Sequence, residues 1–243
     1  MKPVISTIKD IYPSSQAEAQ KQRYKSAVTA FAEHFGSIGE HRFFSAPGRT
    51  EICGNHTDHN HGKVFAASVN LDVIAVVEPT KDDKIVIKSE GFPEDSVDLS
   101  QLAVVPEEKN TSASLIRGVA AGFEKEGMKI GGFRAYTTSD VMKGSGLSSS
   151  AAFEVLVGTI LSHLYNGGQV SAVKIAQISQ FAENVYFGKP SGLMDQMASS
   201  VGGFIAIDFK DTSSPIIESV PADFEKFGHA PVSYTHLRAH ETK

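Results

Sequence analysis

A loop of very small residues runs directly into an apolar segment, and this junction constrains the fold more than any other feature of the chain. The loop, residues 144–150, reads Gly-Ser-Gly-Leu-Ser-Ser-Ser, and residues 151–165 are apolar on almost every side before a stop at Gly167-Gly168. A helix that lacks a polar face has to be buried. The sequence therefore predicts that residues 151–165 form an interior helix around which other elements pack.

The same loop has the properties of an anion site. Glycine lets backbone N–H groups approach an anion without interference from a Cβ, and the start of the following helix adds free N–H donors and partial positive charge. The loop contains neither the Gly-Lys-Ser/Thr end of a Walker A motif nor the Gly-x-Ser-x-Gly of serine hydrolases. Two interpretations stay open at this point: a phosphate site, or a helix N-cap with additional serines.

Helical and strand-like patterns both occur in the rest of the chain, which indicates a mixed α+β fold. Besides the buried segment, helices are expected at residues 14–36, 112–126, 171–187 and 193–200. Strands are expected at residues 41–46, 63–79, 84–88, 132–139 and 203–208. We expect the first strand to end in a turn at Pro47-Gly48, and the polar residues 89–110 to form a loop with little regular structure.

Composition excludes several classes of protein. The chain has 243 residues, enough for one large domain or two small ones, and its net charge of -5 gives no basic field for nucleic acid. A single cysteine, Cys53, rules out an internal disulfide framework and a cysteine-rich metal site, and beside Ile52 it is expected to be a packed apolar residue. Neither a secretion signal nor a membrane-spanning run is apparent, so we expect a cytoplasmic protein without a membrane partner or an obligate protein partner.

Two polar segments follow the first predicted strand. Arg49 comes directly after Pro47-Gly48, and residues 54–61 read Gly-Asn-His-Thr-Asp-His-Asn-His. Asn, Asp and His side chains of this kind can bind the vicinal hydroxyls of a sugar. The alternatives are an ordinary Asn/Asp-rich turn and a metal site. The metal site would use His56, Asp58, His59 and His61, although no known ligand spacing supports it.

Two acidic residues lie in apolar surroundings near the end of the chain. Glu183 interrupts an apolar helical pattern, where a carboxylate is costly unless it is paired or bound to a metal. Asp195 follows a Pro-Ser-Gly break and lies between methionines. Each also has a simpler interpretation: a partly exposed surface acid for Glu183, and a first-turn residue that favours the helix dipole for Asp195.

Taken together, these motifs resemble those of a known family. Pro-Gly-Arg with Gly-Asn-His-Thr-Asp comes first, then Gly-Ser-Gly-Leu-Ser-Ser-Ser-Ala, then Ala-Glu-Asn and Gly-Leu-Met-Asp-Gln. This order resembles the small-molecule kinases named for galactose, homoserine, mevalonate and phosphomevalonate, the GHMP kinases, over nearly all of residues 43–230. The first segment looks specifically like the galactokinase signature.

The resemblance implies an ATP-dependent kinase that phosphorylates galactose at its anomeric hydroxyl, the first committed step of galactose catabolism, with ATP and Mg²⁺ required. It implies that Arg49 and Asp195 form the catalytic pair, and that Ser150 (or Ser149) and Glu183 hold Mg²⁺. The implied sugar pocket consists of Asn55, His56, Asp58, Gly192 and Asp195. The implied ATP loop consists of Gly144, Ser145, Gly146, Leu147, Ser148, Ser149, Ser150 and Ala151.

The implied fold is α+β, that of a GHMP-kinase N-terminal domain (ribosomal protein S5 domain 2-like), with the ferredoxin-like C-terminal domain largely missing. We expect residues 1–200 to form the N-terminal domain and residues 201–230 to begin the truncated second domain. Residues 231–243 are polar and aperiodic, and we interpret them as a non-native tail. Because half of the family's fold would be absent, the chain itself is expected to be inactive or poorly folded.

One departure from the family pattern affects the substrate. The family usually has glutamate where this chain has Asn55, which forms hydrogen bonds but brings no charge. Galactose is the expected sugar, and another hexose such as N-acetylgalactosamine is an alternative. A catalytically silent relative that senses sugar and ATP is a second hypothesis, and a homoserine- or mevalonate-type kinase is a third. The His-Thr-Asp segment argues against the third, because those substrates lack a pyranose ring.

Overall fold

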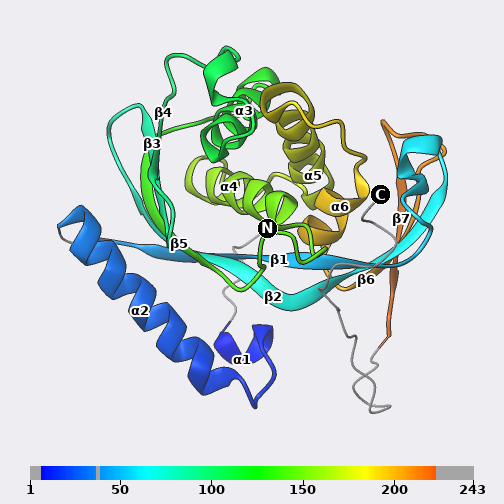
Figure 1. Ribbon diagram of the computed structural model, residues 1–243, viewed down its shortest axis with the longest axis horizontal. Helices are drawn as coiled ribbons and strands as arrows, with labels where there is room; N and C mark the ends of the chain where they lie inside the picture. Colours follow the sequence, from blue (N-terminus) through cyan, green and yellow to red (C-terminus); the bar gives the residue numbers. More distant parts are fainter. Residues whose placement is uncertain (1–6, 37–38, 223–243) are drawn as a thin grey trace, which may run out of the picture.

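A single mixed β-sheet with helices on both faces forms the molecule (Figure 1). The computed structural model describes residues 7–36 and 39–222. The strands are β1 Arg42–Cys53, β2 Lys63–Pro79, β3 Lys84–Ser89, β4 Glu94–Asp98, β5 Phe133–Ser139, β6 Phe204–Asp208 and β7 Ile216–Val220. Their order is β4-β3-β5-β2-β6-β7, and β1 pairs with β2. Only β3 and β5 run parallel; the other pairs of described strands are antiparallel.

The long strand β2 lies at the centre of the sheet and pairs with three other strands. One of its ends pairs with β5 and the other with β6, while β1 follows it along the opposite edge. Residues 73–77 of β2 are all buried, because helices cover both sheet faces there. The run of Val, Ile and Ala in this strand is the sequence pattern typical of such two-sided burial.

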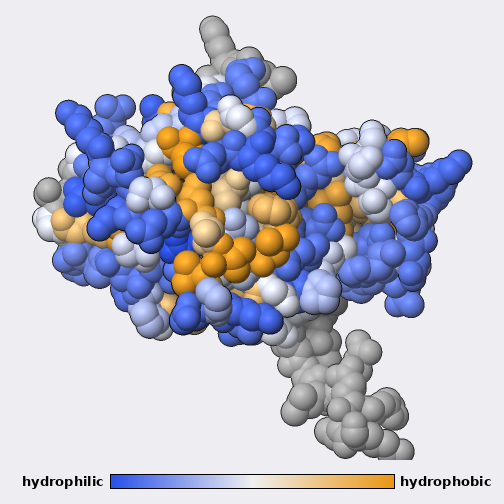
Figure 2. Space-filling view, turned by 90° about the horizontal axis from the view of Figure 1, so that it is seen from above, coloured by the Kyte–Doolittle hydropathy of each residue, from blue (hydrophilic) through white to orange (hydrophobic). Residues whose placement is uncertain are grey.

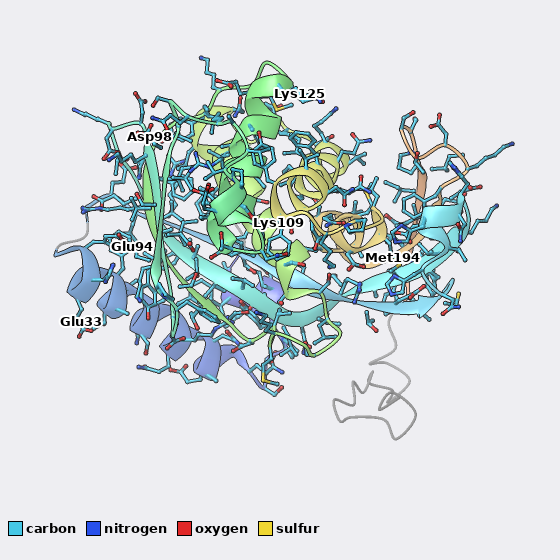
Figure 3. The ribbon with its side chains drawn as sticks, turned by 45° about the horizontal axis from the view of Figure 1, so that its top comes forward. Glu33, Glu94, Asp98, Lys109, Lys125 and Met194 are labelled. Atoms are coloured by element: carbon cyan, nitrogen blue, oxygen red, sulfur yellow. The ribbon has the colours of Figure 1, made fainter. Side chains whose placement is uncertain are left out.

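Helices divide unevenly between the two faces of the sheet. They are α1 Ile8–Ile11, α2 Ala17–Phe35, α3 Ser112–Lys125, α4 Ser149–Tyr165, α5 Ala172–Phe181 and α6 Met194–Val201, with 3-10 turns η1 Thr57–Asn60 and η2 Pro106–Glu108. The helices α3 to α6 lie on one face, and α2 lies on the other (Figure 1; in Figure 3, Met194 marks α6 and Glu33 marks α2). Seen from the side of α3 and α5, the surface has an apolar area bordered by hydrophilic residues (Figure 2).

The prediction of a buried helix after the small-residue loop is confirmed. Ten of the 17 residues of α4 are buried, and its side chains Leu156, Ile160 and Leu161 belong to the main core with the sheet, α3 and α5. The mixed α+β architecture is confirmed as well. No helix among residues 7–36 and 39–222 is both long enough and apolar enough to cross a bilayer.

Several local predictions were wrong. The strand expected to stop at Pro47-Gly48 continues to Cys53, because the chain passes these residues in a bulge between Pro47 and Arg49 on an edge strand, where proline is tolerated. Residues 89–110 contain β4 and η2 instead of loop alone. The helix expected at 171–187 is α5 followed by a π-helical turn, η3 Ala182–Phe187. Cys53 is exposed, because it ends β1 beyond the covered part of the sheet.

Residues 201–222, expected to begin a second domain, contribute β6 and β7 to the same sheet. The boundary at residue 200 stays a prediction. The interpretation of residues 223–230 and of the tail at 231–243 lies outside the described residues.

A buried ion pair ties α2 to the sheet and yields a first prediction. The Asp72 carboxylate is 3% exposed and accepts hydrogen bonds from Arg23 Nη1 at 2.6 Å, from the Tyr12 hydroxyl at 2.5 Å and from Ser45. Replacing Asp72 with Ala leaves Arg23 with the more exposed Asp140, 2.9 Å away, as its ion-pair partner, so we expect a loss of about 3 kcal/mol in the free energy of unfolding. Urea denaturation followed by circular dichroism measures it. A loss below about 1 kcal/mol, the value of a surface pair, would contradict this account.

Candidate functional site

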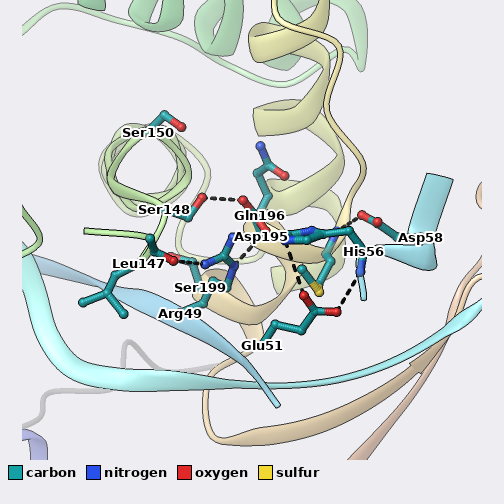
Figure 4. Close-up of polar contacts among 12 residues, drawn as sticks. Arg49, Glu51, His56, Asp58, Leu147, Ser148, Ser150, Asp195, Gln196 and Ser199 are labelled. Carbon is teal, nitrogen blue, oxygen red and sulfur yellow. Dashed lines mark hydrogen bonds and ion pairs between the residues drawn. The ribbon is translucent and has the colours of Figure 1, made fainter. Parts of the chain in front are cut away.

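Strand β1, the loop before α4 and the start of α6 meet at one point, where the structure brings Arg49 and Asp195 together (Figure 4). Arg49 Nε donates to Asp195 Oδ1 at 2.7 Å, and Nη1 donates to the Gly146 carbonyl at 2.5 Å. The backbone N–H of Arg49 also donates to the Leu147 carbonyl at 3.0 Å. The bulge in β1 therefore holds a buried guanidinium between the loop and the carboxylate.

Asp195 is an ionised carboxylate at the start of α6. Burial alone would raise its pKa, but the charge of Arg49 and hydrogen bonds from Arg49 and Ser148 outweigh burial and hold the pKa below the usual 3.8. The Ser148 hydroxyl donates to Asp195 Oδ2 at 2.5 Å. Such a carboxylate is a weak base that can orient a hydroxyl group by accepting its hydrogen bond.

The small-residue loop leads into the N-terminus of α4, a position that favours an anion. Gly144, Gly146 and Ser148 have positive φ angles of 81°, 76° and 58°, so every second residue is left-handed. Within the loop, the Ser145 N–H donates to the Met142 carbonyl at 3.1 Å and the Leu147 N–H to Ser145 Oγ at 3.4 Å. Ser148 begins α4 as its N-cap residue, and the first N–H groups of a helix favour an anion. Because Gly146 and Ser148 contact Arg49 and Asp195, an anion on the loop would lie beside that pair.

Ser150 and Glu183, the predicted metal ligands, are also in contact. The Ser150 hydroxyl donates to Glu183 Oε1 at 3.0 Å, and the Glu183 side chain is 1% exposed. Among the described residues no three acidic, histidine or cysteine side chains are grouped to hold a metal. One carboxylate and one hydroxyl nevertheless fit Mg²⁺, which typically takes one or two protein carboxylates and completes its shell with phosphate oxygens and water.

Behind Glu183 is a polar pair that the sequence analysis missed. Gln196 Nε2 donates to Glu183 Oε2 at 2.7 Å and to Glu154 Oε2 at 3.1 Å, and both Gln196 and Glu154 are fully buried. Burial, together with the charge of Glu183, raises the pKa of Glu154 well above its usual value. An acidic residue on the apolar segment 151–165 was a usable signal for Glu154, and Gln196 stood in the motif Gly-Leu-Met-Asp-Gln without a role assigned to it.

Asp58 and Gly192, two residues of the predicted sugar pocket, touch each other. Asp58 is 4% exposed; its Oδ2 accepts from the Met194 N–H at 3.0 Å, and its Oδ1 has no hydrogen-bond partner among the described residues. A Cβ on Gly192 would lie 1.8 Å from Asp58 Oδ2, so only glycine fits. Both residues line a cavity of about 350 Å³ that also borders His59 and His61.

Two further pocket residues, Asn55 and His56, lie in an exposed left-handed turn with φ angles of 51° and 53°. The sequence analysis missed the residue that holds this turn. Glu51 Oε1 accepts from the His56 N–H at 2.8 Å, and Glu51 Oε2 lies 3.3 Å from His56 Nε2 (Figure 4). Glu51 therefore supplies a carboxylate next to this turn, where the uncharged Asn55 supplies none.

Comparisons with known proteins agree with this geometry. The galactokinase galactose-binding signature matches residues 29–79, and the GHMP kinase N-terminal domain matches residues 114–203. The galactokinase of Lacticaseibacillus paracasei is 34% identical over 195 residues, which are 79% of this chain and 50% of the relative. That of Clostridium beijerinckii is 37% identical over 174 residues, which are 71% of this chain and 44% of the relative. The chain thus spans about half the length of the curated relatives it matches.

Solved structures of GHMP kinases also resemble this chain. A Lactococcus lactis galactokinase complexed with galactose superposes with a TM-score of 0.74 at 30% identity, covering 82% of this chain and 52% of that one. A Methanococcus jannaschii mevalonate kinase superposes with a TM-score of 0.62 at 17% identity, covering 78% and 58%, a likeness of fold alone.

Proposed function

Because this chain belongs to the GHMP kinase family and matches galactokinases over most of its length, we propose that it serves a galactokinase reaction, the transfer of the γ-phosphoryl group of ATP to the anomeric hydroxyl of galactose. The products are ADP and galactose 1-phosphate. One observation carries the proposal: the Arg49–Asp195 pair lies against the loop 144–148, which leads into the N-terminus of α4, a position that favours phosphate.

Phosphoryl transfer depends on positioning and charge stabilisation rather than on covalent chemistry by the protein. Each residue of the site contributes to one of these two tasks. The loop 144–151 holds the triphosphate. Arg49, fixed by its bonds to Asp195 and Gly146, neutralises charge that develops on the transferring group. Ser150 and Glu183 would hold Mg²⁺, which would supply positive charge against the phosphate groups.

Asp195 orients the attacking hydroxyl in this mechanism. Its lowered pKa makes it a poor acceptor of a full proton early in the reaction. A loose transition state tolerates this, because the hydroxyl proton leaves late. Ser148, which donates to the other carboxylate oxygen, keeps Oδ1 and Oδ2 in a fixed orientation.

The sugar contacts are proposed for Asn55, His56, Asp58 and Gly192. The buried Asp58 Oδ1, which has no partner among the described residues, is a suitable acceptor for a sugar hydroxyl. The Glu51 carboxylate holds His56 and brings negative charge near the turn of Asn55. Galactose remains the proposed sugar, with N-acetylgalactosamine as the alternative to compare, and the cytoplasm is the proposed location.

ADP release by the full-length protein, measured over a panel of hexoses, tests the proposal. We expect release that depends on galactose and Mg²⁺, and calorimetric titration of the same sugars then separates binding from turnover. Galactose binding without ADP release would instead indicate a silent sensor. The joint placement of Arg49, Asp195 and Glu183 favours the enzyme, because a sensor has no need of a phosphoryl-transfer site.

A further inference from the structure

A lysine contacts the carboxylate that we assign to the metal. Lys189 Nζ lies 2.9 Å from Glu183 Oε1, the same oxygen that accepts from the Ser150 hydroxyl at 3.0 Å. Among the described residues, no other lysine, arginine or histidine forms an ion pair with Glu183. A buried carboxylate needs a cation close to it, so Lys189 supplies the positive charge that Glu183 requires.

The two partners differ in how firmly they are held. Glu183 lies in the π-helical turn η3, is 1% exposed, and has its second oxygen fixed by Gln196. The Lys189 side chain is 54% exposed, on the short connection between η3 and α6. The carboxylate therefore keeps its position, whereas the lysine side chain can swing out into solvent at little cost.

The electrostatic surroundings explain why an ammonium group rests there. Partial burial acts to lower the pKa of Lys189, but its hydrogen bond and charge interaction with Glu183 outweigh burial and raise the pKa, and Asp195 and Glu154 act in the same direction. The ammonium group contacts one acid, Glu183, and faces solvent on its other side. A divalent metal bound through Ser150 and Glu183 would occupy the same place, and two cations a few ångströms apart repel each other strongly.

We propose that Lys189 is a built-in counter-ion that holds the cation position on Glu183 while no metal is bound, and that Mg²⁺ displaces it. The inference rests on the proposed function, since it concerns the same metal position. It has a direct consequence: free metal binds weakly because it competes with the ammonium group. A metal already bound to a nucleotide competes better, because the loop 144–151 holds the phosphates at the same time.

Binding of Mn²⁺, followed by the electron paramagnetic resonance signal of the free ion, tests the competition without any measurement of activity. We expect Lys189→Met to bind Mn²⁺ roughly tenfold or more tightly than the unchanged chain, because the competing charge is gone. Lys174→Met is the matched control, since it removes a lysine from a surface pair with Glu126 and should leave Mn²⁺ affinity unchanged. The double variant Lys189→Met/Glu183→Gln should lose the gain.

A second measurement uses the unchanged chain and does not depend on how a variant folds. The rate at which acetic anhydride modifies the Lys189 amine, read by mass spectrometry, should rise several-fold when Mg²⁺ and ATP are added, because displacement frees the amine. Lys174 in the same sample should react at a constant rate. Equal or weaker Mn²⁺ binding by Lys189→Met, or a constant Lys189 reaction rate, would overturn the inference.

The two proposals fail in different ways. If no sugar is phosphorylated while Mn²⁺ still competes with Lys189, the galactokinase reaction is wrong and the counter-ion inference stands. If galactose is phosphorylated while Lys189 responds to neither metal test, the inference alone is wrong.

Discussion

Replacing Arg49 with methionine is expected to reduce kcat by roughly 10³–10⁵-fold, the range that an arginine contributes when it stabilises a transferring phosphoryl group. The reason lies in its position: the guanidinium is buried and fixed at two points, by Asp195 at 2.7 Å and by the Gly146 carbonyl at 2.5 Å. It therefore needs no reorganisation as charge develops on the phosphoryl group. Steady-state kinetics of the full-length protein and its variant, with saturating galactose and ATP, measure the loss.

Two further variants separate the chemical role of Arg49 from its structural role. Arg49→Lys keeps the charge but cannot form both bonds in the same geometry, so we expect an intermediate loss. Arg134→Met is a matched control, because Arg134 pairs with Glu78 at 2.8 Å and packs over Phe31 and Phe35 of α2, on the other face of the sheet. It should lower stability and leave kcat unchanged. A kcat for Arg49→Met within about tenfold of the unchanged protein would remove Arg49 from the mechanism.

Asp195→Asn is expected to reduce kcat by roughly 10²–10⁴-fold, the usual range for a side chain that acts on the proton of the reacting hydroxyl group. The amide keeps the size of the side chain but loses the charge that pairs with Arg49, and it can present an N–H where the hydroxyl needs an acceptor. KM for ATP should change little, because the triphosphate is held by the loop. Near-normal turnover would show that Asp195 takes no part in the reaction.

The pH profile provides an independent test of Asp195. Arg49 and Ser148 hold its pKa below 3.8, so the carboxylate stays ionised at every pH above that value. The kcat/KM of the unchanged protein should therefore show no acidic limb from Asp195 between about pH 5 and about pH 8. The stabilising effect of this carboxylate is likewise present at neutral pH and lost only as the pH falls through its folded-state pKa.

The fold could be predicted from the sequence where burial left a clear pattern. The all-apolar segment after the small-residue loop became α4, and the run of Val, Ile and Ala became β2 with the expected bounds. Strand β4, Glu94–Asp98, was missed because only Val97 in it is buried, and a strand with mostly polar residues resembles a loop. The π-helical turn was missed because a period of 3.6 residues does not show where one extra residue is inserted.

The site could be predicted only in part. Arg49 and Asp195 are 146 residues apart, and no spacing rule joins them; the family resemblance suggested the pair, and the antiparallel pairing of β1 with β2 beneath α6 places them in contact. Glu51 and Lys189 had no local signal, and Gln196 stood in the motif Gly-Leu-Met-Asp-Gln without a role, because each is an ordinary polar residue until the fold gives it a partner. The assigned roles of the contacting residues stay predictions until they are tested.

Phosphorus NMR of a mixture of the full-length protein, galactose and MgATP tests the central claim most directly. The account predicts that a new phosphate resonance appears with the proton coupling of an anomeric sugar phosphate, and that the ADP resonances grow at the same rate. Transfer to a different hydroxyl, or ATP hydrolysis that proceeds equally with and without galactose, would contradict the placement of the sugar's anomeric oxygen between Arg49, Asp195 and the loop 144–151.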